Sequence, residues 1–233
     1  MTDGPGISCV GIEPAVERMI VDAARQALEA LGMGADLSAL EISADDLSGT
    51  EDAWLRPRPG PAGGPPALSI YCHPDVFGAP RPSTGTVFPP RAVWERPDPA
   101  AAEGRLTAAG FSRVRSDVFL HHQLLWARDV LRSDLRAADV PASLAEGFAA
   151  AWAVTVDGRL SRLGLPGHVL AERRNLFSRL FSTAGVLMPG HWASFQELWD
   201  GRIARPRDVV GLVRRLPRLQ PRARDLGRAA GEP

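Results

Sequence analysis

The sequence contains no lysine, because all 27 of its basic residues are arginine. Asparagine and tyrosine occur once each, as Asn175 and Tyr71. The absence of lysine excludes a catalytic lysine or a Schiff base formed by this chain. Such a bias is typical of a GC-rich genome, so it does not by itself indicate a function.

Cysteine is also scarce, with Cys9 and Cys72 as its only two positions. They lie too far apart for a CxxC metal site, and two cysteines in a cytoplasmic protein are typical of free thiols rather than of a disulfide. We therefore expect no redox function.

Long hydrophobic runs are missing, since no stretch approaches the roughly 18 apolar residues of a membrane-spanning helix. The first residues, 1–6, lack the basic and then apolar segment of a secretion signal. With 233 residues, of which 45% are hydrophobic, the chain can bury a substantial core. We expect a cytoplasmic globular protein that has no membrane partner.

Net charge is zero, but it is distributed unevenly. Residues 1–60 hold eleven acidic residues and four arginines, whereas residues 201–233 hold nine arginines and three acidic residues. Arginines between Arg202 and Arg228 could neutralise phosphates of a nucleic acid. The neutral total charge and the lack of a known nucleic-acid module favour the alternative, a solvated helix with a frayed end.

The N-terminal half shows one helix and two strands. Helical periodicity begins at Glu13-Pro14 and stops before Gly32, with proline at a first-turn position and glycine just past the end. Residues 40–43 and 67–72 are typical of short strands. Residues 56–66 are so rich in proline and glycine that they predict a surface loop.

A second proline-rich region, 78–99, predicts an irregular loop around an edge strand at 86–88. After it the pattern becomes helical. One helix, capped by Ser116 or Asp117, should continue to about Leu131, and another should run over 141–156. Gly158, Gly164 and Pro166 predict a break, and three more helical pieces are expected around 170–181, 191–199 and 209–216.

The motif that indicates chemistry is His122-Gln123-Leu124-Leu125-Trp126. In the HExxH pattern, two histidines one helical turn apart hold zinc, and the glutamate after the first activates a water molecule. With His122 as the first ligand, Gln123 occupies the position of the base and Trp126 that of the second ligand. Trp126 and Asp129 share a helical face with His122. This segment resembles the motif helix of the zincin metallopeptidases.

A second match supports the resemblance. Residues 143–149, Ser-Leu-Ala-Glu-Gly-Phe-Ala, are similar to the segment on which the gluzincin branch carries its third metal ligand, which here would be Glu146. The resemblance implies an α+β fold, in which an N-terminal helix and a small mixed sheet precede the motif helix and a helical C-terminal half. We expect one zincin-like domain over 1–200 and an Arg-rich helix and tail over 201–233.

The departures from the motif predict the loss of hydrolysis. Trp126 has no lone pair for a cation, so His122 and Glu146 remain as ligands, and Asp129 is a candidate for a third. Gln123 cannot act as a base near neutral pH, and a positioned base is worth about 10² to 10⁴ in rate. If His121 is taken as the first ligand instead, His122 and Leu125 occupy the positions of the base and the second ligand, so the motif is not restored.

Other residues have a functional and a structural interpretation. A vicinal pair such as His121 and His122 also fits one buried and one surface histidine. His121, Trp126, Trp152 and His73 are candidates for the former cleft, with His73 as a replacement ligand. Asp157-Gly158-Arg159 fits a capped turn with a surface ion pair. His168 and His191 fit capping or surface positions, and Trp126, Trp152, Trp192 and Trp199 fit an apolar core.

The sequence thus predicts a catalytically inactive zincin-like homologue that acts as a binding or scaffold protein for an unidentified protein or peptide, without a resident cofactor. An extended peptide can still bind along a sheet edge. One alternative is a zinc-dependent hydrolase with a site rebuilt from His122, Asp129 and Glu146, with His73 or His121 as a further ligand. In this alternative Gln123 orients the water molecule. Another, less favoured, is nucleic-acid binding through the arginines of residues 201–233.

Overall fold

The computed structural model describes residues 4–44, 53–60, 63–79, 106–133, 139–182 and 187–216. The chain divides into two compact units, residues 1–131 and 132–233. The first holds a mixed sheet with helices, and the described part of the second is helical. The predicted α+β class is confirmed in this coarse form. The predicted edge strand at 86–88 lies outside the described residues.

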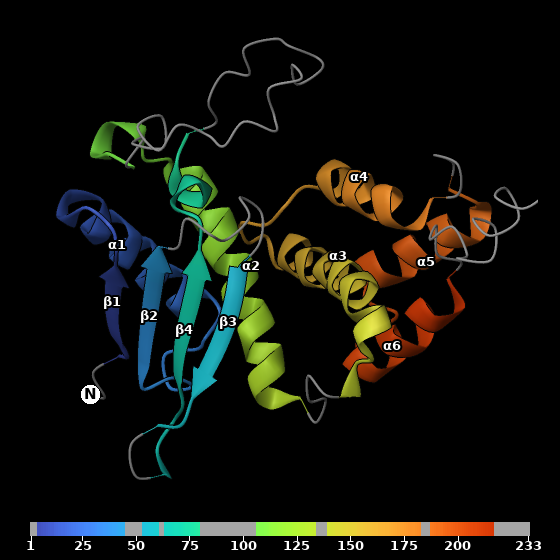
Figure 1. Ribbon diagram of the computed structural model, residues 1–233, viewed down its shortest axis with the longest axis horizontal. Coiled ribbons are helices and arrows are strands. Elements are labelled where there is room, and N and C mark those ends of the chain that lie inside the picture. The colour runs from blue at the N-terminus through green and yellow to red at the C-terminus, as the bar shows by residue number, and fades with distance from the viewer. Residues whose placement is uncertain are drawn as a thin grey trace, which may run out of the picture. The chain divides into compact units, whose positions relative to one another are not determined.

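The sheet of the N-terminal unit has four described strands in the order β1-β2-β4-β3 (Figure 1). Strands β1 (Gly6–Val10), β2 (Ala39–Ala44) and β4 (Ala67–Cys72) are parallel neighbours. Strand β3 (Ala53–Arg58) pairs antiparallel with β4 and forms one edge. The sheet is therefore mixed, as predicted.

Helices α1 (Pro14–Ala30) and α2 (Arg113–Arg132) lie on the same side of this sheet (Figure 1). α1 has proline in its first turn, and it is followed by Gly32 at a φ of 63°, a conformation that favours glycine. Alternate strand side chains point toward the helices, so that the inward residues Leu40, Ile42, Leu68 and Ile70 are all at most 1% exposed. The predicted first helix and both predicted strands are confirmed.

The prediction of a loop over 56–66 is wrong for its first residues, because β3 includes Arg56, Pro57 and Arg58. Proline lacks the N–H of a ladder donor, but an edge strand accepts it where that N–H would face away from the partner strand. Strand β1 was not predicted at all. With only five residues, Gly-Ile-Ser-Cys-Val, it is too short for a clear alternating pattern, and the strand is only partly buried.

The predicted α2 helix is confirmed, but its predicted cap is wrong. Ser116 and Asp117 lie inside the helix, which begins at Arg113. The hydroxyl of Ser112 accepts the N–H of Arg115 at 3.4 Å, as expected of a serine just before the first turn. Ser112 lies four residues before Ser116, and this more N-terminal hydroxyl is the one that caps the helix.

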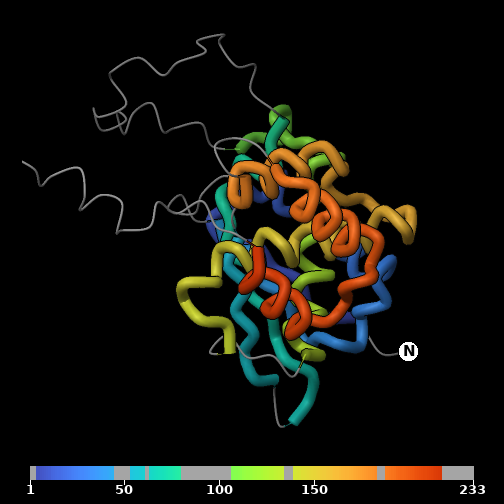
Figure 2. Tube along the Cα trace, turned by 90° about the vertical axis from the view of Figure 1, so that its right-hand side faces the viewer, coloured from blue at the N-terminus to red at the C-terminus, as the bar shows by residue number. Residues whose placement is uncertain are grey.

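The C-terminal unit is built around α3 (Ala145–Leu163). α3 packs against α4 (Leu170–Phe181), α5 (Pro189–Trp199) and α6 (Pro206–Arg215), as Figure 2 shows.

Short 3₁₀ turns occur at Pro74–Phe77, Ala108–Gly110 and Ala142–Leu144. In the described part of the chain, the helices are all too short or too polar to cross a membrane.

The predicted end of the second helix near Val156 is wrong, since α3 continues to Leu163 and stops at Gly164, which has a φ of 67°. Gly158 lies inside the helix for a packing reason. A Cβ atom at this position would overlap the carbonyl oxygen of Trp199 on α5. Gly158 therefore allows the close approach of two helix backbones.

Both cysteines are free thiols, as predicted. Burial raises the pKa of Cys9 and of Cys72 from 9.0 to about 12, with a smaller contribution from the Glu17 carboxylate at Cys9 and from Cys9 at Cys72. At pH 8 the folded chain therefore contains about 10³ times less thiolate than the unfolded chain.

We expect both thiols to react with a disulfide reagent at pH 8 at least about 10²-fold more slowly in the native chain than in urea. Between pH 9 and 12 the unfolded thiols are ionised while the folded ones hold their protons, so this contribution to stability is lost as the pH rises through that window. Native rates equal to those in urea would show that the thiols are accessible. Cys9→Ser and Cys72→Ser separate the two sites.

Candidate functional site

The motif residues lie in the middle of α2, on a buried stretch of the helix. His121 is 5% exposed, His122 is 4% exposed and Gln123 is 8% exposed. The interpretation with one histidine at the surface is therefore wrong. Adjacent residues of a helix point in directions about 100° apart, so both imidazoles can be enclosed only if α2 is covered over a wide arc.

Trp126 contacts His122, one helical turn before it. The ring centroids are 5.7 Å apart and the ring planes are tilted by 59°. A second histidine at this place in an HExxH helix would direct a nitrogen lone pair toward the metal. The indole offers a π-face and an N–H donor instead. The position that the resemblance gives to the second ligand thus holds an aromatic contact with the first.

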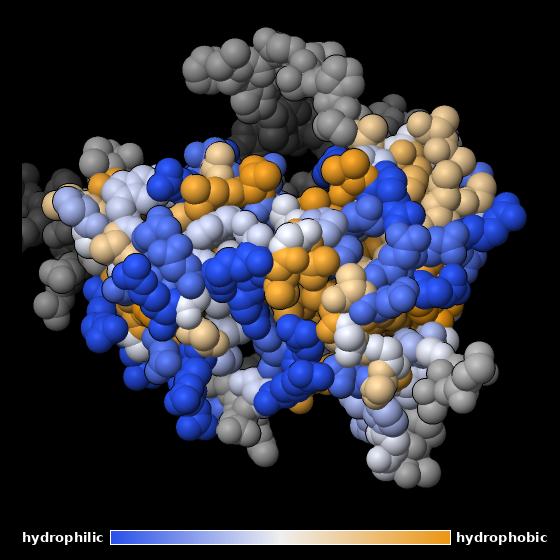
Figure 3. All heavy atoms as spheres, turned by 180° about the vertical axis from the view of Figure 1, so that it is seen from behind, coloured by the Kyte–Doolittle hydropathy of each residue, from blue (hydrophilic) through white to orange (hydrophobic). Residues whose placement is uncertain are grey.

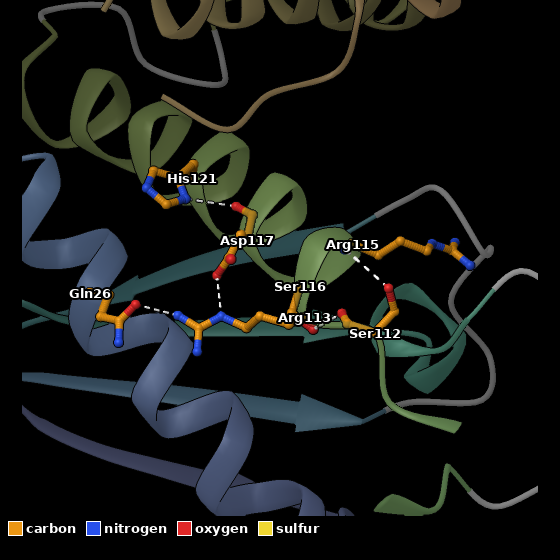
Figure 4. Close-up of polar contacts among 7 residues, drawn as sticks. All are labelled: Gln26, Ser112, Arg113, Arg115, Ser116, Asp117 and His121. Atoms are coloured by element: carbon orange, nitrogen blue, oxygen red, sulfur yellow. Dashed lines mark hydrogen bonds and ion pairs between the residues drawn. The ribbon is translucent and has the colours of Figure 1, made fainter. Parts of the chain in front are cut away.

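His121 belongs to a separate polar network, which Figure 4 shows. Its Nδ1 lies 2.7 Å from the backbone carbonyl oxygen of Asp117, so this nitrogen carries a proton and donates it to that oxygen. The carboxylate of Asp117 accepts Nε of Arg113 at 2.7 Å, and Arg113 also donates to the side chain of Gln26 on α1. The bond from Arg113 to Gln26 joins α2 to α1, and the Asp117 carbonyl orients the ring of His121.

The other predicted site residues are distributed over both units. Asp129 is half-buried on α2. His73 precedes a 3₁₀ turn, and its Nδ1 accepts the N–H of Asp75 at 3.2 Å, which makes it a cap. Glu146 is exposed in the first turn of α3, in the C-terminal unit. The assignments of Asp129, Glu146 and His73 to a metal site stay predictions.

The described residues do not show a complete set of zinc ligands. In the described part of the chain, no three residues among histidine, cysteine, aspartate and glutamate form a group that could hold a metal. A zinc site needs at least three protein ligands, all with lone pairs. His122 and Trp126 supply one such ligand between them.

Sequence reasoning missed a buried ion pair in the C-terminal unit. Asp157 is completely buried in α3, and its carboxylate accepts Nε of Arg173 on α4, which is 9% exposed. It also accepts the backbone N–H of His168 at 3.1 Å. The interpretation of residues 157–159 as a capped surface turn is wrong. The sequence signal that could have indicated this pair is the predicted turn at 164–166. A turn between two helices can bring Arg173 back alongside Asp157.

Core and surface predictions for the tryptophans and histidines were partly right. Trp152 is 2% exposed, stacks on Phe148 and lies under the guanidinium of Arg159, which confirms it as core. Trp192 is 39% exposed, so its core assignment is wrong. His191 is confirmed as a cap, because its Nδ1 accepts the N–H of Met188 at 3.1 Å.

The face of the molecule in Figure 3 shows where side chains of each kind gather. Hydrophilic residues cover much of this face, and hydrophobic residues form several separate patches among them. Over the described residues, the most exposed large hydrophobic side chains are Val114 at 73% and Trp54 at 71%. Trp54 is the more unusual of the two, since it is the larger apolar side chain.

No family model, curated protein or solved structure matches this chain.

Proposed function

We propose that the chain is a zincin-like protein without hydrolytic activity, which acts as a binding or scaffold protein. The observation that carries this proposal is the contact between Trp126 and His122 on a helix with the spacing of a zinc motif. An aromatic ring at the second ligand position and Gln123 at the base position leave neither a zinc site nor a base for water activation.

The order of elements also supports the proposal. A strand, a helix, further strands with an antiparallel edge strand, and then the motif helix follow one another in the N-terminal unit. Apart from the first strand, β1, this is the order that the resemblance implies: a helix, a small mixed sheet and then the motif helix. The division into a domain over 1–200 and a tail over 201–233 stays a prediction.

A binding role suits strand β3, which among the described strands pairs with β4 alone. An extended peptide can add to the other side through backbone hydrogen bonds. Pro57 has no N–H to give, so such a peptide would pair with the first part of the strand, Ala53–Arg56. We propose an extended peptide segment as the occupant of this edge.

The test is the zinc content of the full chain after purification without chelator. We expect much less than one zinc ion per chain, with no change in His122→Ala. One zinc ion per chain that disappears in His122→Ala would instead support the rebuilt hydrolase. Trp126→Phe is the matched control, because it keeps an aromatic ring beside His122.

A further inference from the structure

The side of the sheet away from α1 and α2 has its own pattern of residues. We call this side the outer face. Side chains alternate along each strand, and the register places the outward residues in rows across the sheet. One row is Val10, Ser43, Tyr71 and Trp54, and the next is Ser8, Glu41, Ser69 and Arg56. Figure 1 shows neither α1 nor α2 on this side of the strands.

The first row brings two aromatic residues together at one edge. Trp54 on β3 stands opposite Tyr71 on β4, and Tyr71 is the only tyrosine of the chain. Trp54 is 71% exposed, and Tyr71 is half-buried. A flat aromatic side chain that is this open to solvent is suited to stacking with another flat, weakly hydrated ring.

Cationic side chains accompany the aromatic pair. Trp54, Arg56 and Arg58 occupy alternate positions of β3 and so lie on the same face. Successive members of this series are about 7 Å apart along the strand. Arg56 and Arg58 are two of the four arginines in residues 1–60. Arg56 is exposed and has no ion-pair partner among the described residues. It is therefore available to an anion.

The negative charge of Glu41, which lies on the outer face, is balanced by neighbouring side chains. Glu41 on β2 receives the hydroxyl of Ser69 at 3.2 Å and the guanidinium of Arg58 at 3.4 Å. It is the one acidic side chain in the two central rows. Arg58 therefore balances Glu41, and Arg56, two residues from Trp54 on β3, is the remaining charged side chain in these two rows.

We propose that the outer face binds single-stranded nucleic acid, with a base stacked on Trp54 and the backbone phosphates near Arg56 and Arg58. Exposed aromatics on a four-stranded sheet are a recurrent means of stacking unpaired bases, and arginines beside them neutralise the phosphates. A duplex fits less well, because its bases are already stacked and paired. This surface differs from the Arg-rich C-terminus and from the β3 edge, so it does not depend on the zincin-like proposal.

The test is fluorescence anisotropy of a labelled oligothymidylate titrated with the full chain at several salt concentrations. We expect Trp54→Ala to weaken binding by about 10-fold or more, as is typical for the loss of one base stack. Arg56→Ala should reduce the slope of log affinity against log salt by about 0.7, which is the contribution of one phosphate contact on a single strand.

Matched controls are Trp192→Ala, which removes an exposed tryptophan from the C-terminal unit, and Arg18→Ala, which removes an exposed arginine from α1. Both should bind as the unchanged chain does. The proposal is overturned if no oligonucleotide binds, if a duplex binds as tightly as the single strand, or if Trp54→Ala has no effect. Loss of all binding on deletion of 217–233 would assign it to the tail instead. An oligouridylate in parallel distinguishes RNA from DNA as the preferred strand.

Discussion

Asp157→Ala is expected to lower the free energy of unfolding of the C-terminal unit by about 3–5 kcal/mol, because it leaves a buried guanidinium without its carboxylate. Asp157 is 0% exposed and Arg173 is 9% exposed, so solvent cannot replace the lost partner. The same change removes the acceptor for the N–H of His168. Urea unfolding of the full chain, followed by circular dichroism, measures the effect as a midpoint lower by about 2 M.

A nearby exposed pair provides the control. His168 Nδ1 lies 3.1 Å from Glu172 Oε2, and the side chain of Glu172 is 61% exposed. Glu172→Ala should therefore change stability by no more than about 0.5 kcal/mol. In the double variant Asp157→Leu/Arg173→Met, both charges are gone, and most of the lost stability should return. A loss below about 1 kcal/mol in Asp157→Ala would contradict the account of an enclosed ion pair.

Elements with local signals were predictable from the sequence. α1 has a proline in its first turn, a regular apolar face and Gly32 beyond its end, and its bounds follow from these features. Strand β4 is an apolar run between proline-rich segments. Strand β3 was not predictable in the same way, since Pro57 excludes a central strand but not an edge strand. Its place at the edge depends on pairing with β4, which is a contact distant in sequence.

The candidate site shows the same division. The contact of His122 with Trp126 follows from their four-residue spacing on a helix, which the sequence gives directly. The pair of Asp157 with Arg173 was missed because helix α3 was expected to end before Gly158. Position 158 lies inside the helix and requires glycine, because a Cβ atom there would overlap the backbone of Trp199, 41 residues later in the chain. Local patterns cannot show which glycine serves packing and which one ends a helix.

The double variant Gln123→Glu/Trp126→His is expected to gain zinc binding at about one ion per chain, because it restores the base and the second imidazole of the HExxH pattern. At present the ring at 126 contacts His122 without offering a lone pair. An imidazole at that position lies one helical turn from His122, the spacing at which two histidines hold one metal. Zinc content after dialysis, and titration with a zinc-sensitive dye, measure the gain.

Two further variants make the result specific. Glu146→Gln in the double-variant background should lose the gained zinc if Glu146 is the third ligand, as the resemblance implies. His121→Ala in the same background should keep it, because His121 lies outside the HExxH pattern and its Nδ1 is hydrogen-bonded to the Asp117 carbonyl of the same helix. Gln123→Glu alone should bind no more zinc than the unchanged chain. If the double variant folds, as judged by circular dichroism, and still binds no zinc, then His122 and position 126 do not derive from a metal site, and the zincin-like proposal fails with them.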